Sequence, residues 1–182
     1  TRLVALENTI GGKVISQSYI KEVTSFAKSK GLRSHLDGAR LGNAAVAQKL
    51  SFADISGPFD SVSICLSKGL GAPVGSVLVG PAPLIERAHR WRKMLGGGMR
   101  QAGVLAAACL YAIEHNVNRM SEDHANAERL AAGLAGIAEI AVLNQATNMV
   151  FVKLPEAHTA SLQSALAAKG ISIIAGPKCR LV

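Results

Sequence analysis

The sequence predicts an α/β protein built on a mostly parallel sheet. Short apolar runs of strand length alternate with longer segments that have helical periodicity. Several of these runs end at glycine, asparagine or aspartate, which are typical of turns and helix ends. Two residues that could carry chemistry, Asp37 and Lys68, lie at the ends of apolar runs. Chemistry in open α/β sheets lies beyond the carboxyl ends of the strands, so this placement also favours a parallel sheet.

The first part of the chain supplies the sheet. Strands are expected at residues 3–6, 32–36, 61–66 and 75–79, with helices at 18–30 and 41–50. Gly31 is the expected stop of the first helix.

The later part of the chain becomes helical and then returns to shorter elements. Helices are expected at 83–94, 101–115, 121–134 and 157–169, and strands at 140–143, 149–154 and 171–174. The apolar run at 102–113 predicts a buried helix, because it is too short for a bilayer, which needs ~20 residues. The change of pattern predicts a domain boundary near residue 136, which gives domains 1–136 and 137–182.

Composition excludes disorder as the main state and disfavours nucleic acid. Of the 182 residues, 49% are hydrophobic and 18% charged, and 20 basic residues against 12 acidic ones give a net charge of +8. Aromatic residues make up only 4%, so a basic nucleic-acid binder ranks below both an enzyme and a non-catalytic domain or subunit. A cluster of basic residues suits a small dianion such as phosphate: Arg87, Arg90, Arg92, Lys93 and Arg100.

Neither the cysteines nor the histidines predict metal or redox chemistry. The three cysteines are widely spaced in apolar segments, which predicts small buried side chains in a reducing compartment and no metal site. The five histidines are interpreted as structural, and none is a convincing catalytic base.

Lys68 lies in a glycine-rich turn after an apolar run. The surrounding sequence matches neither the P-loop pattern nor the GxGxxG dinucleotide pattern. A Schiff-base lysine remains, because an apolar strand and a close backbone favour a neutral, nucleophilic amine. The alternative is a solvated lysine at a strand end.

Asp37 strengthens the first interpretation. A pyridoxal phosphate ring needs an acid beside its ring nitrogen, and Asp37 and Lys68 are expected on neighbouring strand ends. Asp37 as a turn or helix-cap carboxylate is the alternative. Arg40 either binds an anionic oxygen in the same pocket or is solvated. Arg180, flanked by apolar residues, predicts a substrate carboxylate or an internal acid as its partner.

Three segments resemble the low-specificity L-threonine aldolases, which are fold-type I pyridoxal phosphate enzymes. They are LDGAR at 36–40, SICLSKGLGAPVGS at 63–76 and RWRKMLGGGMRQ at 90–101. The resemblance covers nearly the whole chain. It implies the aspartate aminotransferase fold, with 1–136 as the C-terminal portion of the large cofactor-binding domain. Residues 137–182 would be the first part of a small α+β C-terminal domain. A long N-terminal section and the extreme C-terminus of these enzymes would then be missing.

The resemblance implies a role for each candidate residue. Lys68 would bind pyridoxal 5′-phosphate covalently and Asp37 would pair with the ring nitrogen. Arg40 would lie near the cofactor and the substrate carboxylate, and Arg180 would clamp that carboxylate. Lys93 and Arg100 would help to bind the phosphate across a dimer interface, or would simply form a basic helix-end surface.

The implied activity is cleavage of L-threonine or L-allo-threonine to glycine and acetaldehyde, in threonine catabolism or glycine biosynthesis. The implied protein is a cytoplasmic homo-oligomer, dimer or tetramer, acting on small β-hydroxy amino acids, with neither nucleic acid nor membrane as a partner. A β-eliminating lyase of the same fold is one alternative. A non-catalytic fragment or subunit that needs the missing N-terminal section is the other.

Overall fold

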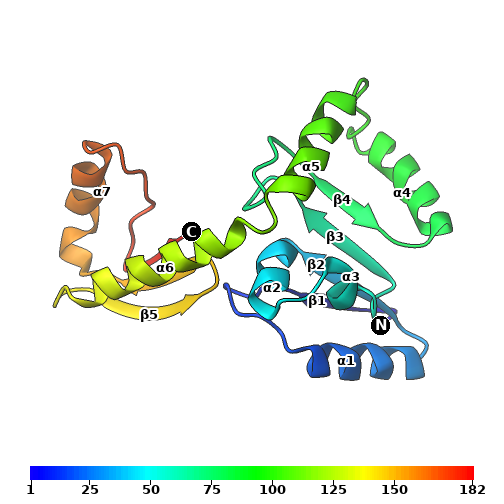
Figure 1. Cartoon of the computed structure of the whole chain (residues 1–182), viewed down its shortest axis with the longest axis horizontal. Coiled ribbons are helices and arrows are strands. Elements are labelled where there is room, and N and C mark those ends of the chain that lie inside the picture. The colour runs from blue at the N-terminus through cyan, green and yellow to red at the C-terminus, as the bar shows by residue number, and fades with distance from the viewer. The chain divides into compact units, whose positions relative to one another are not determined.

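A computed structural model describes residues 1–182, which form two compact units, 1–120 and 121–182. The first unit contains a four-stranded sheet in the order β1-β2-β3-β4 (Figure 1). Its strands are β1 (Leu3–Glu7), β2 (Arg33–Gly38), β3 (Ser61–Cys65) and β4 (Ser76–Val79). The first three strands run parallel and β4 is antiparallel to β3. The predicted α/β class with a mostly parallel sheet is confirmed.

One face of this sheet packs on helices. These are α1 (Gln17–Ser29), α2 (Leu41–Gln48) and α3 (Phe52–Ser56). Ile20, Leu36, Leu41 and Ile55 are fully buried between the helices and the sheet. The helices therefore fix β2 and β3 from one side.

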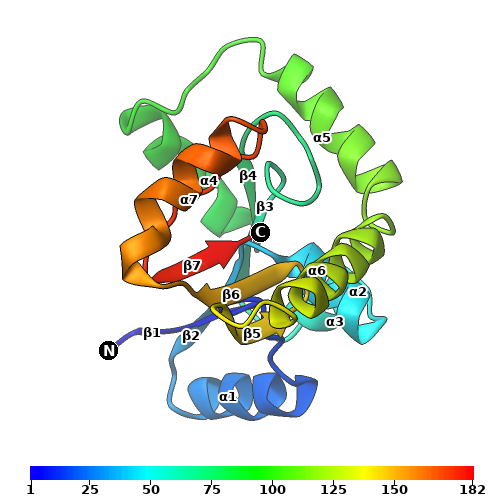
Figure 2. The same ribbon diagram turned by 90° about the vertical axis from the view of Figure 1, so that its left-hand side faces the viewer.

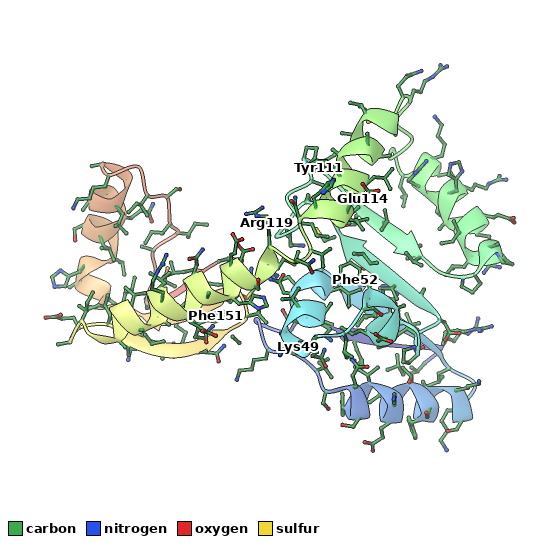
Figure 3. All side chains as sticks on the ribbon, viewed as in Figure 1. Lys49, Phe52, Tyr111, Glu114, Arg119 and Phe151 are labelled. Carbon is green, nitrogen blue, oxygen red and sulfur yellow. The ribbon has the colours of Figure 1, made fainter.

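The short helix α3 was not predicted. Ser51 and Asp54 form a capping box at its start, and Phe52 packs against the core (Figure 3). The Ser-x-x-Asp pattern is a local signal that could have identified it.

The other face of the sheet is open in this chain. Burial alternates along β2, where Ser34 and Leu36 are buried while Arg33 and Asp37 are exposed. Parallel sheets normally have both faces covered. The open face carries Asp37, which makes it the face on which a ligand can reach that carboxylate.

Two helices follow the sheet, α4 (Ala82–Met94) and α5 (Gly103–His115). The sequence predicts α5 as a buried helix, and this expectation is wrong for the chain as it stands. Only Ala112 is buried in α5, whereas Val104 is 71% and Tyr111 63% exposed. An apolar helix is buried only when another surface covers it, and the residues of unit 1 leave most of α5 uncovered.

The second unit is a three-stranded antiparallel sheet with helices (Figure 2). Its elements are α6 (Met120–Ala135), β5 (Ala141–Ala146), β6 (Met149–Lys153), the 3₁₀ turn η1 (Glu156–His158), α7 (Thr159–Ala167) and β7 (Lys178–Leu181). Ala127 and Ala131 of α6 pack with Val150 and Val152 of β6. The helix thus packs within the second compact unit, which begins at residue 121, and the domain boundary expected near residue 136 stays a prediction.

The strand predicted at 171–174 is absent. That segment has no regular structure, and the strand forms instead at Lys178–Leu181, where it pairs with β6. Ile174 is 91% exposed, so the apolar run there has no sheet to join. The other predicted helices and strands are present with small shifts at their ends.

None of the helices is both long enough and apolar enough to cross a membrane.

The core between α1 and the sheet gives a stability prediction. In the protein that carries this chain, replacing fully buried Ile20 with Ala should lower the free energy of unfolding by about 2–5 kcal/mol, because a cavity replaces the side chain. Urea denaturation measures the loss. Ile10 is 53% exposed, so Ile10→Ala is the matched control and should cost far less. Equal losses for the two variants would contradict the core described here.

Candidate active site

The register of three parallel strands brings the candidate residues to one edge. Glu7 pairs with Asp37 across β1 and β2, and Asp37 pairs with Ser63 across β2 and β3. Residues paired in this way point to the same face of a sheet. Glu7, Asp37 and Ser63 therefore share the open face near the carboxyl ends of their strands.

Asp37 is held by the turn that follows β2. Its Oδ1 accepts a hydrogen bond from the backbone N–H of Ala39 at 3.0 Å, and its side chain stays exposed. Gly38 lets β2 approach β3 closely, because a Cβ there would lie 2.6 Å from the carbonyl oxygen of Ser63. Half-buried Arg40 lies directly before α2, three residues after Asp37.

Lys68 follows β3 at the same edge. The Lys68 side chain is one of the groups that lower the pKa of Cys65, the last residue of β3. Cys65 lies two residues beyond Ser63, on the face that Asp37 also occupies. For ordinary strand spacings, the Cα atom of Cys65 is therefore roughly 8 Å from the Cα atom of Asp37. The predicted neighbourhood of Asp37 and Lys68 agrees with this register.

Cys65 has a perturbed thiol. Burial raises the pKa of Cys65, but hydrogen bonds from Ser67, Ser76 and Lys68 outweigh burial and lower the pKa below its ordinary value. The Ser67 hydroxyl lies 3.6 Å from the Cys65 sulfur. The expectation of buried cysteines is confirmed only for Cys179, since Cys65 and Cys109 are partly exposed.

The charges at this edge are separated. Glu7 and Asp37 stand side by side on neighbouring strands, and two like charges in register repel unless a cation lies between or above them. Lys68 follows β3, on the other side of Asp37 from Glu7 in the strand order. This arrangement suits a ligand that is cationic at one end and reactive toward an amine at the other.

The remaining candidates lie on other segments. Lys93 is in the last turn of α4 and Arg100 is in the following loop, both exposed. A Cβ on Gly98 would collide with the Lys93 side chain, so the glycine lets that side chain fold back over the loop. Arg180 is on β7 of the second unit, opposite Phe151 in the register. The roles expected for these three residues stay predictions.

Sequence reasoning missed two groups at this edge, Glu7 and Cys65. Glu7 and Cys65 could have been found, because alternation along β1 and β3 places them on the face of Asp37 once the register is known. His35, interpreted as structural, lies on the same face, where its Nδ1 is 2.8 Å from the Ser61 hydroxyl.

The family is established by comparison with known proteins. Residues 1–157 match the family model described as "Beta-eliminating lyase". The chain belongs to the beta-eliminating lyase family.

Two curated relatives carry aldolase names. The chain is 50% identical over all 182 residues to the "Low specificity L-threonine aldolase" of Escherichia coli (strain K12), covering 54% of that protein. It is 49% identical over 161 residues to the "Probable low-specificity L-threonine aldolase 2" of Arabidopsis thaliana, covering 86% of the chain and 45% of the relative. The chain spans about half the length of these relatives.

Solved structures agree with the fold. A "Putative aromatic amino acid beta-eliminating lyase/threonine aldolase" from Exiguobacterium sp. 255-15 superposes with a TM-score of 0.82 at 24% identity, over 97% of this chain and 54% of that one. A "PLP-dependent aminotransferase" from Streptococcus suis superposes with a TM-score of 0.68 at 15% identity, over 100% and 52% of the two chains. The expected fold-type I architecture is confirmed.

The Cys65 contact predicts a pH dependence. Because its pKa is lowered, the Cys65 thiolate should form at lower pH than that of buried Cys179, whose pKa is raised by burial. Iodoacetamide labelling across pH, read by peptide mass spectrometry, should give Cys65 the lower midpoint. Lys68→Met removes one of the groups that lower the pKa of Cys65 and should move that midpoint upward. An unchanged midpoint in Lys68→Met would contradict an influence of Lys68 on the Cys65 thiol.

Proposed function

We propose that the protein carrying this chain is a pyridoxal 5′-phosphate-dependent lyase that cleaves L-threonine and L-allo-threonine to glycine and acetaldehyde. The observation that carries the proposal is the parallel pairing of β2 and β3, which brings Asp37 and the loop that carries Lys68 to the same edge of the sheet. The names of the relatives, which match over 86% to 100% of the chain, support the substrate class.

The residues at the edge fit this cofactor. The paired carboxylates of Glu7 and Asp37 favour a protonated ring nitrogen, and the amine of Lys68 is the group that an aldehyde requires. When bound, pyridoxal phosphate supplies an electron sink that accepts the electron pair of a bond broken at Cα.

The chain's own residues then bind and orient. Asp37 holds a proton on the ring nitrogen, and Lys68 retains the cofactor between turnovers. Arg40, at the start of α2, binds an anionic oxygen of cofactor or substrate, and Arg180 binds the substrate carboxylate. Fixing the carboxylate fixes which bond at Cα is aligned for cleavage.

The proposed reaction balances without a further reactant. A base removes the proton of the substrate β-hydroxyl, the Cα–Cβ bond breaks, and acetaldehyde leaves. Cα then takes up a proton to give glycine. None of the five histidines is assigned as the base.

We propose further that the rest of the protein contributes to this site. The chain spans about half the length of its curated relatives, one sheet face is open, and α5 is largely exposed. An N-terminal section of the same polypeptide would cover that face. Lys93 and Arg100 would bind phosphate in a cytoplasmic homo-oligomer, dimer or tetramer, and 1–136 and 137–182 would belong to its large and small domains.

A second candidate is β-elimination, because the family model and one solved structure carry that name. It uses the same residues but breaks the Cα–H bond and the bond from Cβ to a leaving group. Incubation with L-threonine, L-allo-threonine and L-cysteine separates the two. Acetaldehyde and glycine support the aldolase, whereas pyruvate from L-cysteine supports the alternative.

Lys68 is the decisive residue for either lyase. Lys68→Ala in the protein that carries this chain should lower the rate of acetaldehyde release from L-threonine on the order of 10³-fold or more, because the cofactor loses its covalent anchor. Release is followed with alcohol dehydrogenase and NADH. Lys21→Ala, an exposed lysine of α1, is the control and should keep wild-type turnover. Sustained turnover by Lys68→Ala would refute the assignment.

Asp37 is expected to act through charge rather than shape. Asp37→Asn can still accept the hydrogen bond from Ala39 but loses the negative charge. We therefore expect a large decrease in kcat and a Tm close to that of the wild type. Activity and Tm are measured on the same preparation. A variant with wild-type kcat would show that the ring nitrogen does not need this carboxylate.

A further inference from the structure

The turn that carries Lys68 is closed by its own backbone. The N–H of Gly71 donates to the carbonyl of Lys68 at 2.8 Å, and the N–H of Ala72 donates to the carbonyl of Leu66 at 2.9 Å. Gly71 has a φ of +75°, which a residue with a Cβ adopts only at a cost. The backbone of Lys68 is thus one corner of a tight loop.

Two buried leucines hold this loop against α5. Leu66 is 1% and Leu70 2% exposed, and both pack with Ala112 of α5 and Met120. Lys68 lies between them in the sequence but is itself exposed. The packing of these leucines does not determine how the peptide groups of the loop are oriented, which depends on hydrogen bonds to those groups.

One side chain from outside the loop supplies such a bond. The side-chain amide Nδ2 of Asn116 donates to the carbonyl oxygen of Leu70 at 2.8 Å. Asn116 follows α5 directly, after the turns that carry Tyr111 and Glu114 (Figure 3), and its own N–H donates to Ala112. The loop between β3 and β4 lies beside α5 in Figures 1 and 2.

We propose that Asn116 is a positioning residue that holds the Lys68 turn in its reactive conformation. The proposal rests on the function proposed above and adds a residue to it. Asn116 does not touch Lys68, and it acts through the Leu70 carbonyl and the turn between residues 68 and 71. Displacement of a reacting amine by about 1 Å costs on the order of 10²-fold in rate. A small movement of the turn after loss of the Asn116 hydrogen bond would therefore lower the reaction rate measurably.

A purely structural role as the residue that caps the end of α5 makes a different prediction. In that case substitution lowers the stability of the helix end but leaves the position of Lys68 unchanged. Tm alone does not separate the two roles, and the test therefore needs a measurement that reports on Lys68 itself.

The test uses the protein that carries this chain, with two variants and one control. Asn116→Asp keeps the shape but cannot donate to the Leu70 carbonyl, and Asn116→Ala removes the side chain. The control is Asn126→Asp, an exposed position on α6 whose Oδ1 accepts from Arg129. Both Asn116 variants should weaken binding of pyridoxal phosphate by about tenfold, while the control binds as wild type. Bound cofactor is measured by its visible absorbance.

A second readout needs no cofactor. In the cofactor-free protein, the pH midpoint for iodoacetamide labelling of Cys65 reports on the position of Lys68, because the Lys68 side chain is one of the groups that lower the pKa of that thiol. It should rise in both Asn116 variants and stay unchanged in Asn126→Asp. Variants with a lowered Tm but wild-type cofactor affinity and wild-type Cys65 midpoint would overturn the proposal. If the wild type binds no pyridoxal phosphate, the proposed function fails, and the Cys65 midpoint alone decides whether Asn116 positions Lys68.

Discussion

The parallel register of β1, β2 and β3 is the constraint on which the site depends. It pairs Glu7 with Asp37 and Asp37 with Ser63, and it brings the end of β3 beside the end of β2. A shift of one residue would turn Asp37 toward the helices, because side chains alternate between the two faces of a strand. The buried faces of α1, α2 and α3 prevent that shift, so the packing of Ile20 and Leu36 fixes the position of a carboxylate on the opposite face.

Lys68 is fixed by different means. It lies beyond the sheet, in a loop held by two buried leucines, a glycine at positive φ and a hydrogen bond from Asn116. The two ends of the site therefore depend on independent parts of the structure, strand register for Asp37 and loop closure for Lys68. The cofactor proposed here would join them.

Local patterns were enough to predict the sheet, most helices and the placement of Asp37 and Lys68 after neighbouring strands, because alternation and turn residues are read along the chain. Non-local features were not predictable. The run at 171–174 has the apolar character of a strand but no neighbour to pair with, and α5 is apolar without being covered. Asn116 could not be connected with Lys68 from the sequence, because Asn116 reaches the Lys68 turn through the carbonyl of Leu70, which is 46 residues away from Asn116 along the chain.

The central claim is that Lys68, in the loop after β3 and at the same edge of the sheet as Asp37, is the amine that holds pyridoxal phosphate. Borohydride reduction of the cofactor-loaded protein, followed by peptide mapping, tests it most directly. The account predicts a single reduced pyridoxyl group on the peptide that contains Lys68. A pyridoxyl group on another lysine, with Lys68 unmodified, would contradict it.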